Sequence, residues 1–358
     1  ICESGAETLA AATFCELDQY DRPVVGYMNF CLTKIPVQDG AVPTGEIGNT
    51  VAVAVHELGH VFGIHSEQFK YFRNAINGEP LTKRPFCSGR MPCVDGMEQY
   101  IIMPADNTVK AGYTKKGAIF YELVTPTVAQ VVRNQFNCFS MTGARLENQP
   151  TSDNDCFGSH FDERMFYSET MSAFFAQEAN YFSPLTLAIL EDSGWYRANY
   201  TSATVQISPF GHGAGCDFVL NDCIVNGGEI PDYSRGYFCN NSLEQNNNGQ
   251  LYGDLTCDPS HTHKAFCDLS DQGPPVPEEY QYFNNKNLQP GLTRTDFCPT
   301  ANVGVVDCTD ITHPTNTIGE TFGEQSKCFN FKSKAPLKAG ATCLQSVCNI
   351  TSRRLEIL

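Results

Sequence analysis

The chain has 358 residues, of which 41% are hydrophobic and 18% are charged. This is enough apolar material for two or three domains with buried cores, and it excludes an intrinsically disordered protein. The net charge of -16 and the pI near 4.9 exclude nucleic acid and anionic membrane surfaces as expected partners, because both are negatively charged.

Cysteine usage predicts where the protein resides. Seventeen cysteines are too many for a reducing cytosol, and the sequons at Asn199, Asn240 and Asn349 agree with the secretory pathway. No apolar run approaches the ~18 residues that span a bilayer, and no signal peptide precedes Ile1. We therefore expect a secreted or extracellular cell-surface protein with a trimmed chain, so that any membrane association would depend on parts outside it.

The first element that the sequence predicts is a short β-strand. Residues 22–31 read Arg-Pro-Val-Val-Gly-Tyr-Met-Asn-Phe-Cys. Pro23 has no backbone N–H to donate, and proline in sheets is therefore found at strand starts and on edge strands. We expect this strand to lie at an exposed edge.

The most informative motif is His56-Glu57-Leu58-Gly59-His60, which follows an apolar run. Residues four apart lie on one face of a helix, so both imidazoles can bind one cation while Glu57 lies beside it. Asn49 or Thr50 is the expected N-cap, and Gly63 is the expected helix end. The motif indicates a zinc site with its own general base. The alternative is a capped helix with two ordinary histidines.

A catalytic zinc takes three protein ligands and leaves one position for water. The extended pattern H-E-x-x-H-x-x-G-x-x-H is matched through Gly63, but Ser66 occupies the position of the third histidine. His65 lies one residue too early, and a shift of one residue redirects the side chain. We expect His65 to be a surface residue or a neighbour of the ligands, so the third ligand must come from elsewhere.

Two further helices are predicted in the middle of the chain. The first begins at Thr125-Pro126 and continues to about Gln135, with apolar residues spaced for one buried face. The second begins at Ser183-Pro184, an N-cap followed by proline at the first helical position, and is closed by Gly194.

The last 143 or so residues differ in character, because ten of the seventeen cysteines follow residue 215 among turn-rich tracts. This composition predicts a disulfide-stapled, loop-rich domain. His261 and His263 lie near cysteines and are candidate metal ligands, but we expect them to be surface residues. His212, between two glycines, is expected in a loop.

The odd number of cysteines predicts an unpaired thiol. Residues 1–65 hold three cysteines and residues 66–215 hold four, so pairing within regions leaves Cys2, Cys15 or Cys31 over. Cys2 is favoured because it lies next to a chain start that looks cut. A bridge between regions is the alternative.

Taken together in this order, the motifs from about residue 20 to 200 resemble the leishmanolysin family of metzincin zinc peptidases. The matching segments are His56-Glu57-Leu58-Gly59-His60-Val61-Phe62-Gly63, Leu146-Glu147-Asn148-Gln149, Gly158-Ser159-His160-Phe161, Glu169-Thr170-Met171, Ser183-Pro184-Leu185-Thr186-Leu187-Ala188 and Leu190-Glu191-Asp192-Ser193-Gly194-Trp195-Tyr196. The resemblance implies that His160 is the third zinc ligand, displaced from the helix by a long insertion. It also implies that Met171 forms a methionine turn, an apolar floor beneath the metal.

The resemblance implies an α+β fold with a metzincin-type catalytic core around the active-site helix, a mixed central region and a disulfide-rich, loop-rich C-terminal domain. The expected regions are a truncated N-terminal catalytic subdomain at residues 1–65, a central subdomain with the third ligand and methionine turn at 66–215, and the cysteine-rich domain at 216–358. Only 55 residues precede His56, so most of the sheet expected before the helix is taken to be missing.

The predicted function is that of a zinc endopeptidase acting on proteins or peptides. One Zn²⁺ held by His56, His60 and His160 would activate a water, with Glu57 as the general base. The strand at residues 22–31 could hold an extended peptide by backbone hydrogen bonds. The alternative is a non-catalytic cell-surface adhesion or binding protein on a peptidase scaffold, suggested by the short N-terminal region and the cysteine-rich tail.

Overall fold

The computed structural model describes residues 2, 8–148, 156–174, 180–202, 204–242, 244–245, 251–271, 273–313, 319–332 and 339–358. Helices and sheets are both present, as an α+β fold requires, and the chain forms two compact units, Ile1–Val219 and Leu220–Leu358. The first unit thus spans both of the N-terminal regions expected from the sequence.

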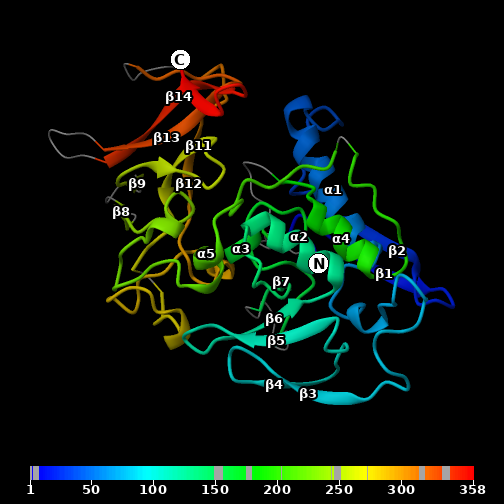
Figure 1. Cartoon of the computed structure of the whole chain (residues 1–358). Coiled ribbons are helices and arrows are strands. Elements are labelled where there is room, and N and C mark those ends of the chain that lie inside the picture. Colours follow the sequence, from blue (N-terminus) through cyan, green and yellow to red (C-terminus); the bar gives the residue numbers. More distant parts are fainter. Residues whose placement is uncertain are drawn as a thin grey trace. The chain divides into compact units, whose positions relative to one another are not determined.

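A hairpin and a long helix form one side of the first unit. Strands β1 (Ala10–Leu17) and β2 (Pro23–Phe30) pair in antiparallel fashion, and helix α1 (Ile47–Val61) packs against them (Figure 1). Gly26 permits this contact, because a Cβ there would lie 2.7 Å from Cγ1 of Val61. The predicted strand is confirmed, with Pro23 at its first position.

The rest of the first unit consists of short strands and helices. Two sheets are antiparallel, one formed by β3 and β4 and the other by β5, β6 and β7. The elements are 3-10 helices η1 (Thr44–Glu46) and η2 (Phe69–Tyr71), strands β3 (Ser88–Pro92), β4 (Glu98–Ile102), β5 (Val109–Tyr113), β6 (Ile119–Leu123) and β7 (Ala144–Arg145), and helices α2 (Pro126–Phe136), α3 (Glu163–Phe166) and α4 (Pro184–Asp192). Helix α5 (Cys216–Leu220) lies where the two units meet in sequence.

The predicted start of α1 is wrong, because neither Asn49 nor Thr50 is the N-cap. The helix begins at Ile47, after Glu46. The Thr50 hydroxyl donates to the carbonyl oxygen of Glu46 one turn earlier, at 3.0 Å, so it serves a helical carbonyl rather than a free N–H. The other end agrees with the sequence, since Gly63 has φ +112°, which only glycine adopts readily.

Helices α2 and α4 are confirmed and lie side by side (Figure 1). The Ser183 hydroxyl caps α4 by accepting a 3.0 Å hydrogen bond from the N–H of Leu185. Asp192, at the end of α4, accepts hydrogen bonds from the first N–H groups of α2, at Thr127 and Val128. The end of α4 therefore caps the start of α2, in addition to the packing between the two helices.

The second unit is built from short strands and disulfides. Strands β10, β11 and β12 form one antiparallel sheet, β13, β14 and β15 form another, and β8 pairs with β9. Its elements are β8 (Glu244–Gln245), β9 (Leu251–Tyr252), β10 (Thr256–Cys257), β11 (His263–Cys267), β12 (Ala301–Asp307), β13 (Ser326–Lys332), β14 (Ala339–Asn349) and β15 (Arg354–Ile357), with 3-10 helices η3 (Asp232–Ser234), η4 (Glu278–Tyr280) and η5 (Thr293–Thr295).

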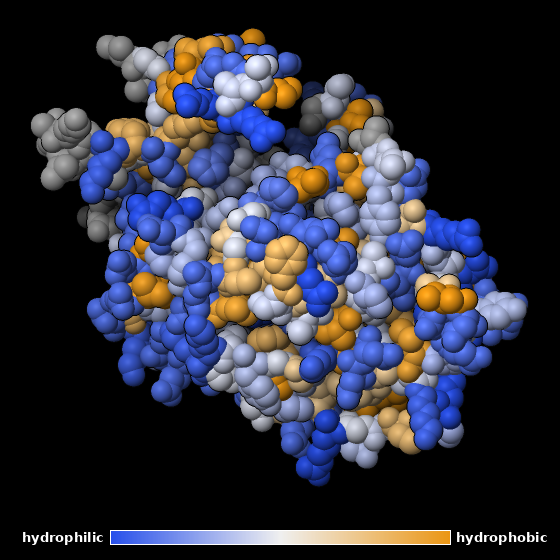
Figure 2. All heavy atoms as spheres, in the orientation of Figure 1, coloured by the Kyte–Doolittle hydropathy of each residue, from blue (hydrophilic) through white to orange (hydrophobic). Residues whose placement is uncertain are grey.

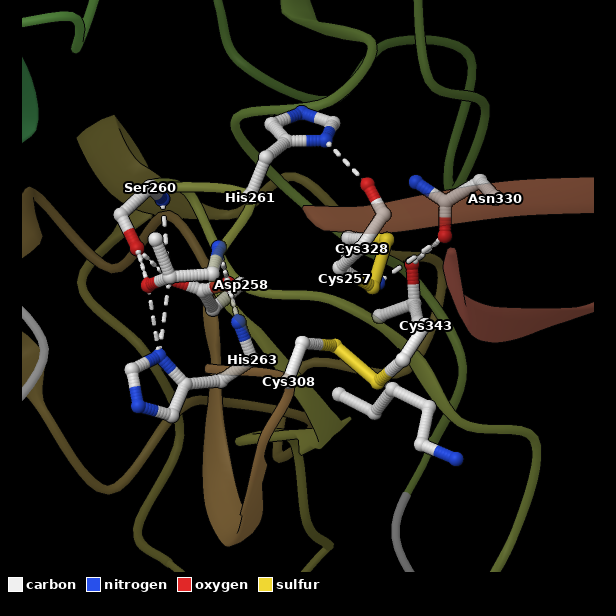
Figure 3. Close-up of a disulfide and its surroundings, with 12 residues drawn as sticks. Cys257, Asp258, Ser260, His261, His263, Cys308, Cys328, Asn330 and Cys343 are labelled. Atoms are coloured by element: carbon white, nitrogen blue, oxygen red, sulfur yellow. Dashed lines mark hydrogen bonds and ion pairs between the residues drawn. A yellow bond between two sulfur atoms is a disulfide. The ribbon is translucent and has the colours of Figure 1, made fainter. Parts of the chain in front are cut away.

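Part of this unit's core consists of cystines. The half-cystines of Cys257–Cys328 and Cys308–Cys343 pack together as one buried cluster (Figure 3). Beside them the buried carboxylate of Asp258 accepts hydrogen bonds from the backbone N–H groups of three following residues and so fixes the loop before β11. Covalent links and a polar loop thus replace part of a larger apolar core, as expected for a cysteine-rich domain.

The disulfides correct the prediction about the odd cysteine. Cys2 is bonded to Cys31, whereas Cys15, Cys87 and Cys348 are free and exposed. Cys15 is one of the three predicted candidates, whereas the preference for Cys2 is wrong, and Cys87 and Cys348 are free as well because the Cys138–Cys216 bridge joins two of the expected regions. The disulfides are Cys2–Cys31, Cys93–Cys156, Cys138–Cys216, Cys223–Cys298, Cys239–Cys267, Cys257–Cys328 and Cys308–Cys343. Cys138–Cys216 crosses the boundary that had been expected at residue 215.

On the face shown in Figure 2, hydrophobic residues form separate groups between hydrophilic ones, as is usual for a protein surface in water. Among the described residues, no helix is both long and apolar enough to cross a membrane.

Candidate metal site

Helix α1 places two histidines of the motif one above the other. His56 and His60 lie one turn apart, and their Nε2 atoms are 3.1 Å from each other. His60 is buried and His56 is half-buried, so both rings point toward the interior of the unit. The helical spacing therefore produces the juxtaposition that the sequence predicts.

His160 reaches the same point from a segment between two others. Phe161 forms bridges with Leu146 on one side and Ser172 on the other, and its N–H donates to the Met171 carbonyl oxygen. Nε2 of His160 lies 3.1 Å from Nε2 of His60 and 3.2 Å from that of His56. Within the part of the chain that the structure describes, these three residues form the one cluster able to hold a metal ion.

The second nitrogen of each ring meets an oxygen that can only accept a hydrogen bond. Nδ1 donates to the Thr170 carbonyl oxygen in His56 (2.6 Å), to the Ile64 carbonyl oxygen in His60 (2.7 Å) and to Oε1 of Glu147 in His160 (2.6 Å). The proton therefore lies on Nδ1, and each Nε2 directs its lone pair toward the other two. Burial favours this neutral form, because it lowers the pKa of His56 to about 4 and that of His60 well below its usual value.

Glu57 lies beside these rings on α1. It is 5% exposed, and its Oε2 has no hydrogen-bond partner among the described residues. Burial raises the pKa of Glu57 to about 7, and the nearby His160 opposes this shift. A carboxyl group that titrates near neutral pH can both accept and return a proton, which is the requirement for a general base.

Met171 lies under α1 and is fully buried. A Cβ on Gly59 would lie 2.5 Å from its Sδ and 3.0 Å from its Cε, so the absence of a side chain at Gly59 makes room for the thioether. Gly59 stands between His56 and His60 in sequence, and Met171 therefore packs against the ligand-bearing turn.

His65 is not one of the three convergent histidines, but its ring lies edge-on to that of His60, with centroids 6.4 Å apart. Its Nδ1 accepts a hydrogen bond from the Glu67 N–H, and its ring packs edge-on against Phe14. Ser66 occupies the position of the third histidine in the longer pattern. Its backbone N–H donates a 3.0 Å hydrogen bond to the Ser159 hydroxyl.

The other histidines are dispersed. His261 is exposed, as expected, and His212 lies in a turn, as expected for a loop residue. His263 differs, because its side chain is 13% exposed and lies near Asp258 and Asp307. Sequence reasoning gave no role to Glu147 or Thr170; Glu147 lay in a segment noted for its resemblance, whereas a backbone carbonyl leaves no trace in residue type.

Comparisons with known proteins show which family the chain is similar to. The family model described as Leishmanolysin matches residues 2–357. The chain is 28% identical over 289 residues to the "Leishmanolysin-like peptidase" of Drosophila melanogaster, covering 78% of this chain and 40% of the relative. It is 26% identical over 363 residues to that of Caenorhabditis elegans, covering 92% and 52%.

A protozoan relative extends the likeness. The "Leishmanolysin" of Leishmania tropica is 24% identical over 291 residues, covering 81% of this chain and 36% of the relative. The chain thus spans about half or less of the length of these curated relatives.

Proposed function

Because this chain belongs to the leishmanolysin family of peptidases, we propose that it is a zinc-dependent endopeptidase. The observation that carries the proposal is the convergence of three Nε2 atoms, from His56, His60 and His160, beside the Glu57 carboxyl group. The family is zinc-dependent. Membership of this chain in the family supports the proposal that it is a metallopeptidase and that its substrates are proteins or peptides.

The donor set fits zinc. A tetrahedral zinc with Zn–N bonds of about 2.0–2.1 Å holds its nitrogens about 3.3 Å apart. The three Nε2 atoms lie 3.1–3.2 Å from one another, and their lone pairs would repel at that separation without a cation between them. We propose these histidines as the ligands, with the fourth position left to water.

Bound zinc would lower the pKa of a coordinated water and polarise the carbonyl group of the scissile peptide bond. Glu57 takes a proton from the attacking water and delivers it to the leaving amine. Its buried position suits this role, because the raised pKa makes the carboxylate a stronger base than an exposed glutamate. His56, His60 and His160 keep their lone pairs available because their Nδ1 protons are held by oxygens.

Met171 serves as the apolar floor of the site in this proposal. Its thioether supports the turn of α1 at Gly59, and its backbone carbonyl accepts the N–H of Phe161, next to His160. A single residue thus fixes both ligand-bearing segments, as a methionine turn of the metzincin type would.

The substrate would lie along β2. This strand pairs with β1 and, within the described residues, has no partner on its other edge. It packs against the ligand-bearing helix α1, so a peptide in extended conformation could add to the edge by backbone hydrogen bonds.

An extracellular location accompanies this function. Seven disulfides join fourteen of the seventeen cysteines, and such bonds persist in oxidising compartments. The second candidate function, a non-catalytic adhesion or binding protein, is favoured by the separate disulfide-rich unit at Leu220–Leu358.

An assay of the zinc-loaded chain distinguishes the two functions by measuring whether it hydrolyses an unstructured protein substrate. Glu57→Ala removes the base and leaves the three histidines in place. We expect hydrolysis by the parent chain and loss of at least about 100-fold in the variant, with zinc content unchanged. Zinc binding without hydrolysis by either protein would favour the adhesion function.

A further inference from the structure

The three histidines of the site differ in what holds their Nδ1 atoms. His56 and His60 donate to backbone carbonyl oxygens, whereas His160 donates to a carboxylate oxygen, Oε1 of Glu147, at 2.6 Å. Carboxylate acceptors are charged, so this hydrogen bond is stronger than the other two. Among the described residues, Glu147 is the one acidic side chain in such contact with the three rings.

The backbone fixes Glu147 opposite His160. The Glu147 N–H donates to the His160 carbonyl oxygen at 3.0 Å, and the Gly158 N–H donates to the Glu147 carbonyl oxygen at 2.9 Å. The neighbouring Leu146 N–H is bonded to the Tyr121 carbonyl oxygen on β6. The same backbone hydrogen bonds therefore hold both Glu147 and His160, the residue whose ring its carboxylate contacts.

Gly158 leaves the space that this carboxylate occupies. A Cβ at this position would lie 1.8 Å from Oε1 of Glu147, far closer than two non-bonded heavy atoms can approach. The carboxylate is also mostly shielded, with the Glu147 side chain 12% exposed and that of His160 22% exposed. Shielding from water strengthens a charged hydrogen bond.

We infer that Glu147 is a positioning residue for the metal site: its carboxylate fixes the ring and the Nδ1 proton of His160 and raises the electron density at Nε2. A histidine held in this way binds a divalent cation more strongly than one held by a neutral oxygen. The inference rests on the proposed function, because it assumes that Nε2 of His160 faces zinc.

The test measures zinc affinity with a competing chelator for the 358-residue chain and its variants. Glu147→Ala should weaken zinc binding by about 10–100-fold, the usual effect of removing the partner of a ligating histidine. Gly158→Ala should weaken it too, because its Cβ displaces the carboxylate without removing it. Glu98→Ala, which removes an exposed carboxylate paired with Arg90, is the matched control and should bind as the parent does.

A second readout separates positioning from a general loss of structure. The visible absorption bands of the cobalt-substituted chain report the ligand field, and Glu147→Gln should shift them while leaving the metal-free thermal unfolding near that of the parent. Gln keeps an acceptor oxygen but lacks the charge, so its zinc affinity should fall between those of the parent and Glu147→Ala. Unchanged bands together with parental zinc affinity in Glu147→Gln and Gly158→Ala would overturn the inference.

His160→Ala distinguishes this inference from the proposed function. If that variant binds zinc as the parent does, the proposed metal site is wrong. If it loses zinc while Glu147→Ala and Gly158→Ala bind normally, the site stands and only the role of Glu147 is refuted.

Discussion

The backbone N–H of Ser66 donates a 3.0 Å hydrogen bond to the hydroxyl of Ser159, the residue directly before His160. Ser66 occupies the position at which the longer metzincin pattern would place its third histidine. In this chain Ser66 instead forms a hydrogen bond to the segment that carries His160. The two bonded residues, Ser66 and Ser159, are 93 residues apart in sequence. The turn that follows α1 is thus bonded to the segment that carries His160, through the residue at which the chain differs from the longer histidine pattern.

The two candidate third ligands should respond differently to substitution. His160→Ala should abolish high-affinity zinc binding, because it removes one of three convergent nitrogens. His65→Ala should leave zinc binding nearly intact, because its Nδ1 accepts from Glu67 and its ring lies outside the cluster. Isothermal titration with zinc measures both, and equal losses in the two variants would refute the assignment.

Met171 should act through packing. Met171→Leu conserves volume and should cost less than about 1.5 kcal/mol of unfolding free energy while retaining zinc. Gly59→Ala should cost more, about 1–3 kcal/mol, because its Cβ would lie 2.5 Å from the Met171 sulfur. Chemical denaturation of the metal-free chain measures these changes.

Gly48 provides the matched control for Gly59, since it lies in the same helix and a Cβ there would meet nothing within 4 Å. Gly48→Ala should be neutral or stabilising by up to about 1 kcal/mol. Loss of zinc in a folded Met171→Leu variant would mean that the thioether is a ligand.

The pH dependence of hydrolysis should follow Glu57. The base is the carboxylate, so kcat/KM should fall as the pH decreases through the Glu57 pKa, which burial raises to about 7 in the metal-free chain. A bound cation stabilises the carboxylate and moves this midpoint lower, toward the ordinary value of 4.5.

Zinc content measured at each pH is the control for that profile. The pKa of His56 is about 4 and that of His60 is lower than usual, so these ligands resist protonation while Glu57 titrates. Activity that stays constant from pH 8 down to pH 4.5, with zinc retained, would argue against Glu57 as the base, because the expected midpoint lies between 4.5 and about 7.

Thiol accessibility tests the cysteine pairing. Under native, oxidising conditions an alkylating reagent should label Cys15, Cys87 and Cys348, which are free and exposed. Cys2 and Cys31 should stay unlabelled because they are bonded to each other. Peptide mass mapping after labelling identifies the sites, and label on Cys2 would contradict this pairing.

Local signals predicted the elements whose ends depend on nearby residues. Ser183 and Pro184 begin α4, and Gly63 ends the turn after α1, because capping and positive φ are properties of one or two residues. The predicted start of α1 was wrong because a threonine hydroxyl can bond either a free N–H at a helix start or a carbonyl oxygen one turn earlier. Which of the two Thr50 bonds depends on the fold and not on its residue type.

Contacts between distant segments were beyond local patterns. His160 came from the family resemblance, since it lies 104 residues from His56 and no spacing rule joins them. The pairing of Cys2 with Cys31 depends on the tertiary fold, which parity ignores. Glu147 carries no sign of its partner in its own sequence neighbourhood, because its contact with His160 depends on the antiparallel bridge between Leu146 and Phe161.

The most direct test of the account is a crystal structure of the zinc-loaded chain with anomalous diffraction data collected above and below the zinc absorption edge. We predict one anomalous peak among the Nε2 atoms of His56, His60 and His160, about 2.0–2.1 Å from each, with water in the fourth position. A peak bound by His65 in place of His160, or no peak among these three nitrogens at saturating zinc, would contradict it.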